Sequence, residues 1–151
     1  MILYPNAHFN NVREITVEFL KENKIKALIL DVDNTLIDYD RNLEEETIKW
    51  AENLKEKVQK VAERMKLGYD YFAKKPLKKG FKKVQKLLEE EPQNIGVVGD
   101  QIFTDVVGGN ASKMFTILVE PIAEKDIWIT MLKRPLENAI KRRYEKQRKE
   151  K

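Results

Sequence analysis

Short apolar runs, bounded by charged or polar residues, recur along this chain at intervals filled by longer segments. Three of them stand out, at residues 25–30, 94–99 and 115–119. Continuous apolar runs of this length are typical of strands that are buried on both faces of a parallel sheet. Residues 69–73 form a fourth, weaker candidate strand, whereas residues 1–11 show no regular pattern and are predicted to be irregular.

The segments between these runs carry apolar residues at helical spacing. We predict helices from about Val12, capped by Asn10 or Asn11, from Pro76, and from about Asp126 into the tail. A short helix is predicted at residues 104–112, broken by its two adjacent glycines, and residues 43–66 are predicted to form one continuous helix. Strands alternating with helices predict an α/β fold, with a doubly wound parallel sheet in three layers. We expect residues 1–151 to form a single domain without a large cap domain.

Aspartates follow two of the predicted strands. Asp31 and Asp33 come after residues 25–30, and Asp100 and Asp105 come after residues 94–99. In open α/β sheets the carboxyl ends of the strands border the ligand crevice, so these carboxylates could converge there on one Mg²⁺ ion. The alternative for the first pair is an ordinary Asp/Asn turn, and for Asp105 a cap on the short helix that follows.

The motifs in their order along the chain resemble those of a known superfamily. Asp31-x-Asp33-x-Thr35-Leu36, then Lys75-Pro76, then Gly99-Asp100-x-x-x-x-Asp105 resemble haloacid dehalogenase (HAD) phosphatases of the IIIA type. Residues 73–77, residues 99–106 and Gly108-Gly109-Asn110 are most similar to the YqeG family, which is related to phosphatidylglycerophosphate phosphatases. The resemblance covers most of the chain and implies a HAD-like, Rossmann-type fold.

The resemblance implies a chemical role for the first two aspartates. Asp31 would attack the phosphoryl group and form an aspartyl-phosphate, since an ionised carboxylate needs no activating base. Asp33 would protonate the leaving alcohol and then deprotonate the attacking water. Asp31, Asp100 and the backbone carbonyl of Asp33 would hold Mg²⁺.

Three further residues receive supporting roles. Asp105 would be a second metal ligand on the Asp100 side, or a support for Asp100. Lys75 would hold the phosphate as a point charge, although the chain is rich in lysine and only the following Pro76 distinguishes it. Thr35 would pin the loop through its hydroxyl group.

One element of the family pattern is not found in the sequence. HAD phosphatases carry, between the first aspartates and the lysine, a strand that ends in a Ser or Thr which grips the phosphate. Here the only Ser or Thr between Leu36 and Lys75 is Thr47, inside a helical pattern. We therefore expect the second strand to be missing near residues 55–58. If the chain truly lacks this strand and its motif, we expect the sheet to be one strand short and phosphatase activity to be weak or absent.

Composition narrows the classes of function further. Apolar residues make up 42% and charged residues 36% of the 151 residues, which predicts a globular domain with a highly charged surface. The chain has no cysteine and a single histidine, His8, which excludes a thiolate nucleophile and argues against a histidine triad or a histidine-rich zinc site. Without a leader pattern or an apolar run of about 20 residues, we expect a cytoplasmic protein.

The C-terminal region is basic. Residues 133–151 contain nine Lys or Arg and three Asp or Glu. Apolar residues recur every fourth position, which predicts an amphipathic helix that ends in a basic tail at about residues 141–151; they are Trp128, Leu132, Leu136, Ile140 and Tyr144. This helix could simply pack on the domain with a solvated end. It could also bind an anionic membrane surface, which would make the protein peripheral to the membrane, or RNA.

These observations together predict a Mg²⁺-dependent phosphomonoester hydrolase. Its substrate would be a phosphorylated small molecule or a lipid phosphate such as phosphatidylglycerophosphate. The alternative is a non-catalytic binding module that keeps the HAD fold, lacks the Ser/Thr motif and uses its basic tail on RNA or anionic lipid.

Overall fold

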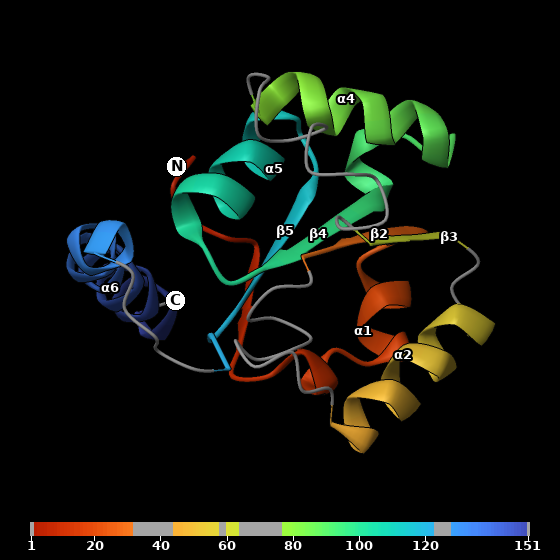
Figure 1. Cartoon of the computed structure of the whole chain (residues 1–151), viewed down its shortest axis with the longest axis horizontal. Helices are drawn as coiled ribbons and strands as arrows, with labels where there is room; N and C mark the ends of the chain where they lie inside the picture. Colours follow the sequence, from red (N-terminus) through yellow and green to blue (C-terminus); the bar gives the residue numbers. More distant parts are fainter. Residues whose placement is uncertain (1, 32–43, 58–59, 64–76, 123–127, 151) are drawn as a thin grey trace.

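A computed structural model describes residues 2–31, 44–57, 60–63, 77–122 and 128–150 of the chain. These residues form a three-layer α/β domain around a five-stranded parallel sheet with strand order β1-β5-β4-β2-β3 (Figure 1). The strands are β1 (Ala7–Phe9), β2 (Ala27–Leu30), β3 (Lys60–Glu63), β4 (Ile95–Gly99) and β5 (Phe115–Val119). The predicted fold class is confirmed.

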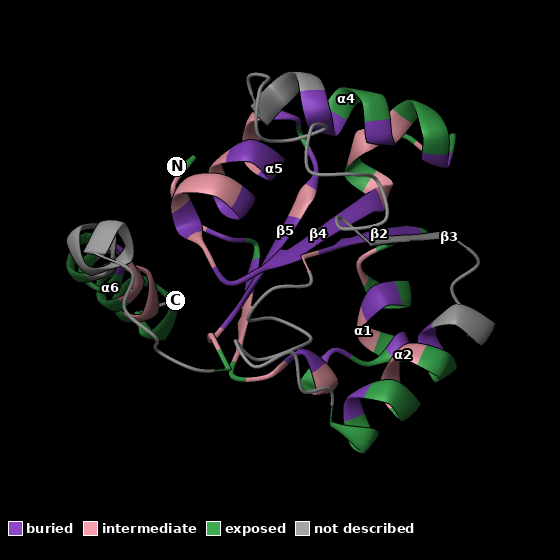
Figure 2. Ribbon diagram, viewed as in Figure 1, coloured by how far each residue is buried: buried purple, intermediate pink, exposed green. Residues whose placement is uncertain are grey.

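The central strands are buried as their apolar sequences predict. Every residue of β2 and β4 is buried, and the two strands pair in parallel from Ala27 opposite Ile95 to Leu30 opposite Val98. Helices α1 (Val17–Glu22) and α2 (Glu45–Lys57) lie on one face of the sheet, and α4 (Leu77–Leu88) and α5 (Val107–Ala111) lie on the other (Figures 1 and 2). This double covering explains why these strands read as unbroken apolar runs.

Alternate residues of β2 supply the two sides of the core. Leu28 and Leu30 pack with Leu20 of α1 and Leu54 of α2. Ala27 and Ile29 face the opposite cluster, which contains three residues of α4, namely Phe81, Val84 and Leu88. Because successive side chains of a strand point to opposite faces of the sheet, the apolar residues of β2 contribute alternately to the two clusters.

The second strand is present, contrary to our prediction. Helix α2 ends at Lys57, and Lys60–Glu63 then form β3, which pairs with β2 from Ala27 opposite Lys60 to Leu30 opposite Glu63. The predictions of one continuous helix over residues 43–66 and of a sheet one strand short were therefore wrong. Strands β3 and β4 occupy both edges of β2, and the predicted strand at residues 69–73 lies outside the described residues.

The error has a physical cause. Strand β3 is at the edge of the sheet, and its sequence, Lys-Val-Ala-Glu, places charged residues at both ends, as edge strands often do. A strand of four residues is too short to show a clear alternation of apolar and polar residues. The helical spacing of apolar residues that continues from α2 therefore dominates the prediction. The other part of the interpretation still holds, because the sequence contains no Ser or Thr between this strand and Lys75.

The N-terminal residues are more regular than predicted. Ala7–Phe9 form β1, which pairs in parallel with β5 from Ala7 opposite Ile117 to Phe9 opposite Val119. The helix predicted from Val12 is instead a 3₁₀ turn, η1 (Val12–Glu14), capped by Asn11, followed by α1, capped by Thr16 through the Phe19 N–H. The hydrophobic spacing alone predicts one helix here. The side-chain caps at Asn11 and Thr16 instead begin two separate short elements, η1 and α1.

The glycines at residues 108 and 109 do not break their helix. A π turn, η3 (Ile102–Val106), leads directly into α5, which contains both glycines. A Cβ atom on Gly108 would lie 2.3 Å from Cε2 of Phe81, and one on Gly109 would lie 2.5 Å from Cγ2 of Thr116. These glycines therefore let α5 approach α4 and the sheet closely.

The last helix, α6 (Trp128–Lys149), begins close to its predicted start and packs beside the sheet edge that contains β1 (Figure 1). Ile140 packs against Ile102, Val106 and Leu118, and the Tyr144 ring lies 5.8 Å from the Tyr4 ring, so these two predicted inner positions are confirmed. Leu136, however, is 57% exposed, whereas the neighbouring Glu137 is only 2% exposed. Trp128 and Leu132 lie in the part of α6 whose side chains are not described.

Much of the described surface of α6 faces solvent, as Figure 2 shows. The exposed side chains include five cationic residues, namely Arg142, Arg143, Lys146, Arg148 and Lys149. Among the described residues, none of the helices combines the length and the apolar character needed to cross a membrane. The apolar residues that recur every four positions in α6 therefore belong to a surface helix that packs on the domain along one side.

Candidate active site

Two predicted site residues stand at the ends of adjacent parallel strands. Asp31 directly follows β2 and Asp100 directly follows β4. The Asp31 N–H donates a hydrogen bond to the Val98 carbonyl at 2.9 Å, which extends the ladder between these strands by one residue. The register of the sheet therefore places both aspartates at the same edge, where the carboxyl ends of the strands meet.

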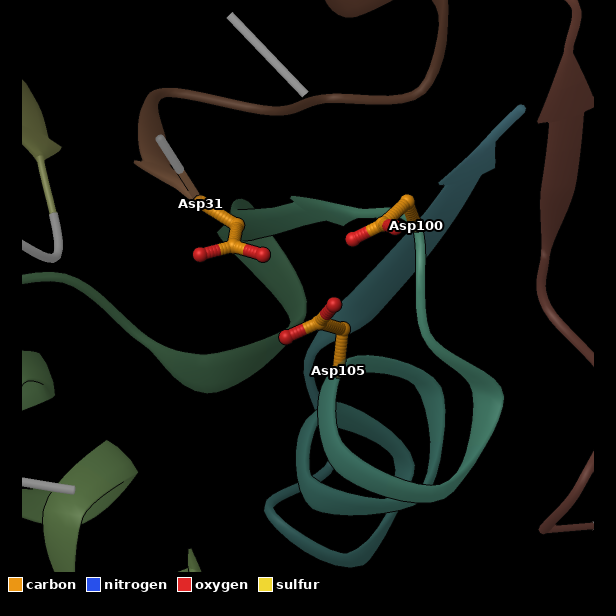
Figure 3. A group of neighbouring side chains, drawn as sticks. All are labelled: Asp31, Asp100 and Asp105. Atoms are coloured by element: carbon orange, nitrogen blue, oxygen red, sulfur yellow. The ribbon is translucent and has the colours of Figure 1, made fainter. Parts of the chain in front are cut away.

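Asp105 completes the cluster from the π turn η3. Carboxylate oxygens of Asp31, Asp100 and Asp105 all lie within 4.8 Å of one another, and Figure 3 shows the three side chains converging. Asp100 is 1% exposed and Asp105 is 2% exposed, while Asp31 is partly exposed. Two of the three carboxylates are therefore buried, and that of Asp31 is partly accessible.

The Gly-Asp-Gln sequence that begins at the last residue of β4 explains how Asp105 reaches this position. A Cβ atom on Gly99 would lie 2.1 Å from Oδ2 of Asp105, so only glycine leaves room for the carboxylate. The Gln101 N–H donates to Oδ2 of Asp105 at 3.1 Å, and the Asp105 N–H donates to the Gln101 carbonyl at 2.9 Å. Asp105 does not cap α5, which has no side-chain cap, so that alternative was wrong.

Three carboxylates this close together need a compensating positive charge. Burial disfavours ionised carboxylates, and each negative charge disfavours the others. A bound divalent cation removes both penalties, and carboxylate oxygens are the donors that Mg²⁺ prefers. The chemistry of this donor set therefore fits the predicted magnesium ion, and Asp31, Asp100 and Asp105 are the described side chains that would hold it.

The remaining predicted site residues are not described. Asp33, Thr35 and Lys75 lie in residues 32–43 and 64–76, outside the described ranges. Their roles stay predictions. Of the six predicted residues, the structure thus brings together Asp31, Asp100 and Asp105.

The structure contains two polar features, one near this cluster and one away from it, that the sequence analysis does not predict. The first is Glu137, whose buried carboxylate accepts a hydrogen bond from the Phe103 N–H of η3 at 3.5 Å. A signal existed, because an acidic residue three positions before Ile140 shares a helix face with it. The spacing of the apolar residues alone, however, predicts Leu136 and not Glu137 on the inner face of α6.

The second feature is a set of charged side chains around His8 in β1. The His8 Nε2 lies 2.7 Å from Glu120 and its Nδ1 lies 2.7 Å from Glu145 of α6, while Lys141 lies 3.2 Å from Glu120. The hydrogen bond with Glu120 raises the pKa of His8 above its ordinary value, against the effect of burial. The hydrogen bond from His8 likewise lowers the pKa of Glu120 to about 2. We call this set, His8, Glu120, Lys141 and Glu145, the His8 clasp, because it joins β1 and the end of β5 to α6.

The α/β fold and the acidic cluster at its strand ends define a class of hydrolase, and two family models match the chain in agreement with it. Residues 72–121 match the HAD-hydrolase-like family, and residues 1–67 match the family described as mitochondrial PGP phosphatase. The two matches together include all three aspartates of the cluster. They indicate a hydrolase of the HAD class.

One curated relative narrows the class to a family. The probable phosphatase YqeG of Bacillus subtilis (strain 168) is 35% identical over 151 residues, which cover 90% of this chain and 88% of that protein. The chain belongs to the YqeG family of HAD phosphatases, and it is a hydrolase that acts on phosphate esters. Among solved structures, none gives a significant match.

Proposed function

We propose that the protein is a Mg²⁺-dependent phosphomonoester hydrolase that acts through an aspartyl-phosphate on Asp31. The observation that carries this proposal is the convergence of Asp31, Asp100 and Asp105 within 4.8 Å at the carboxyl ends of β2 and β4. Three clustered carboxylates repel a phosphate ester unless a cation is bound among them. A bound Mg²⁺ would offset this repulsion and the charge of the transferring phosphoryl group.

The reaction divides into two displacements at phosphorus. In the first, a carboxylate oxygen of Asp31 forms a bond to phosphorus as the bond to the ester oxygen breaks, and Asp33 gives its proton to the leaving alcohol. In the second, Asp33 takes a proton from a water molecule whose oxygen attacks the phosphorus. Inorganic phosphate leaves and the Asp31 carboxylate is restored.

The three groups differ in what their surroundings favour. Asp31 is partly exposed at the strand end, which suits a nucleophile that must reach substrate. Asp100 and Asp105 are buried behind it, which suits groups that hold a cation and stay in place. Lys75 is the side chain that we assign to the phosphate oxygens, where a lysine ammonium acts as a point charge.

A lipid phosphate is the substrate class that we propose. The match of residues 1–67 to a family described as mitochondrial PGP phosphatase supports it. The exposed cationic side chains of α6 also support it, because they would attract an anionic membrane surface that carries such a substrate. Under this proposal the protein works at the membrane surface.

Turnover of an aryl phosphate tests the metal dependence directly. EDTA should abolish hydrolysis and added Mg²⁺ should restore it, whereas Asp100→Asn should stay inactive at the same Mg²⁺ concentration. A matched control is Asn138→Ala, which alters an exposed residue of α6 and should behave as the parent. Full hydrolysis in EDTA would exclude the proposed mechanism.

A further inference from the structure

A buried acidic residue of α6 lies beside the turn that carries Asp105. Glu137 is 2% exposed, which is rare for a glutamate unless polar groups compensate its charge. Its Oε1 atom accepts a hydrogen bond from the Phe103 N–H at 3.5 Å. Phe103 is in η3, between Gln101 and Asp105, so α6 contacts the backbone of the site loop itself.

A second contact from the same face of α6 reaches the same turn. Ile140, three residues after Glu137, packs against the apolar cluster that Leu118 forms with Ile102 and Val106, the first and last residues of η3. Residues three apart share one face of a helix. Helix α6 is therefore linked to η3 by a hydrogen bond and by an apolar cluster that contains both ends of the turn, and the two together restrict the position and the rotation of the turn.

The turn needs such external support. A π turn is rare, often occurs at functional sites, and like any helix leaves its first N–H groups without partners inside the turn. Inside the loop, the Gln101 carbonyl accepts from the Asp105 N–H at 2.9 Å and the Gln101 N–H donates to the Asp105 carboxylate at 3.1 Å. A displacement of Phe103 would move the segment that makes both bonds.

We propose that Glu137 is a positioning residue: its buried carboxylate holds η3 and so keeps Asp105 in place opposite Asp31 and Asp100. The consequence for metal binding rests on the proposed function, whereas the effect on the loop does not. Helix α6 thus takes part in the geometry of the site without touching substrate.

Amide hydrogen exchange of the metal-free protein tests the effect on the loop. Glu137→Leu removes the acceptor and should speed exchange at the Gln101 and Asp105 amides by about tenfold or more, because each hydrogen bond there loses its support. Glu137→Gln keeps an acceptor and should restore most of the protection. The matched control is Leu20→Ala, which weakens the core on the other face of the sheet.

The outcomes separate positioning from general destabilisation. Faster exchange at these two amides in Glu137→Leu than in Leu20→Ala, compared at equal stability, supports the inference, and equal exchange overturns it. If Glu137→Leu does not fold, Ile140→Ala removes the apolar half of the same contact and is compared in the same way.

Binding of Mn²⁺, followed by electron paramagnetic resonance, tests the consequence for the site. Loss of a group that orients a metal ligand typically weakens metal binding by about 10- to 100-fold, and we expect this for Glu137→Leu but not for Leu20→Ala. Equal affinity in the parent and Glu137→Leu would overturn the role of Glu137 at the site. If the parent binds no Mn²⁺, the proposed function fails, and hydrogen exchange still decides the positioning of the loop.

Discussion

Gly99 sets how closely Asp105 can approach the end of β4. Because a Cβ atom there would lie 2.1 Å from the Asp105 carboxylate, we expect Gly99→Ala to displace Asp105, to lower stability by about 1–3 kcal/mol and to weaken metal binding. The control is Gly96→Ala on the same strand, whose Cβ would meet Leu28 at 2.7 Å in the core instead. Urea denaturation and Mn²⁺ titration of both variants check this. A Gly99 variant that binds Mn²⁺ as tightly as the parent would contradict it.

Asp100 should link metal binding to thermal stability. A ligand that binds only the folded state stabilises it by about 2.7 kcal/mol at 100 times its dissociation constant. We therefore expect saturating Mg²⁺ to raise the melting temperature of the parent and to leave that of Asp100→Asn unchanged. Calorimetry in Mg²⁺ and in EDTA measures both shifts, and an equal rise in the variant would place the ion elsewhere.

The sequence has no Ser or Thr between the end of β3 and Lys75. One oriented donor to the developing charge is typically worth about 10²–10³ in rate. We expect the parent to hydrolyse aryl phosphate slowly compared with HAD phosphatases that have this hydroxyl. Steady-state kinetics measure it, and ordinary turnover rates would show that another group supplies the missing donor.

At the scale of elements, the strands that carry the aspartates could be predicted and the edge strands could not. Strands β2 and β4 are buried on both faces, so their apolar runs and the polar residues that end them are visible in the sequence. Strand β1 has three residues and β3 has four with charged ends, and their pairing with β5 and β2 arises only in the assembled sheet. The cluster itself was predictable for the same reason, because it lies at the ends of the two visible strands. The spacing of Glu137 from Ile140 indicates a shared helix face, but the burial of Glu137 could not be predicted, since it depends on how α6 is rotated against η3.

The His8 clasp should make the docking of α6 depend on pH. The pKa of His8 is raised in the folded state, so its contribution is fully present below the unfolded value of about 6.5 and is lost as pH rises through the folded value. The pKa of Glu120 is lowered to about 2, so its contribution is present above its ordinary value of 4.5 and is lost at acidic pH. The charged groups facing His8 are Glu120 and Glu145, with Lys141 beside Glu120.

The stability lost in His8→Gln should therefore be greatest between these limits, near pH 5.5, and should shrink as the pH rises through the raised pKa of His8. Urea denaturation of the parent and the variant, in a series of buffers from pH 5.5 upward, measures the difference. Lys49→Gln, which breaks an exposed pair with Glu45 on α2, is the control and should show no such change. A constant difference across this range would contradict the proposed charge on His8.

At the scale of the whole molecule, α6 joins the site to a basic surface. Arg142, Arg143 and Lys149 are exposed, while Lys141 and Glu145 of the same helix hold it to the domain through the His8 clasp. Removing residues 141–151 would therefore disturb docking as well as charge. Replacing exposed cations with Gln separates the two effects.

We predict that the variant with Arg142, Arg143 and Lys149 changed to Gln binds anionic vesicles more weakly and hydrolyses soluble aryl phosphate at the parent rate. Basic residues near a charged membrane each contribute about 1 kcal/mol, screened by salt. Vesicle sedimentation at low salt measures binding. Equal binding of vesicles by the variant and the parent would show that α6 has only a structural role. Binding to RNA but not to vesicles would exclude a membrane surface as the partner of α6.

The account depends most on Asp31 as the nucleophile of the acidic cluster. The measurement is hydrolysis of an aryl phosphate in Mg²⁺ by the parent and by Asp31→Asn, with acid-quenched samples searched by mass spectrometry for phosphorylated Asp31. The account predicts turnover and a phosphorylated Asp31 in the parent alone, with the variant inactive but unchanged in fold by circular dichroism, because an amide keeps the shape of the side chain and cannot attack phosphorus. Hydrolysis by Asp31→Asn at the parent rate would contradict it.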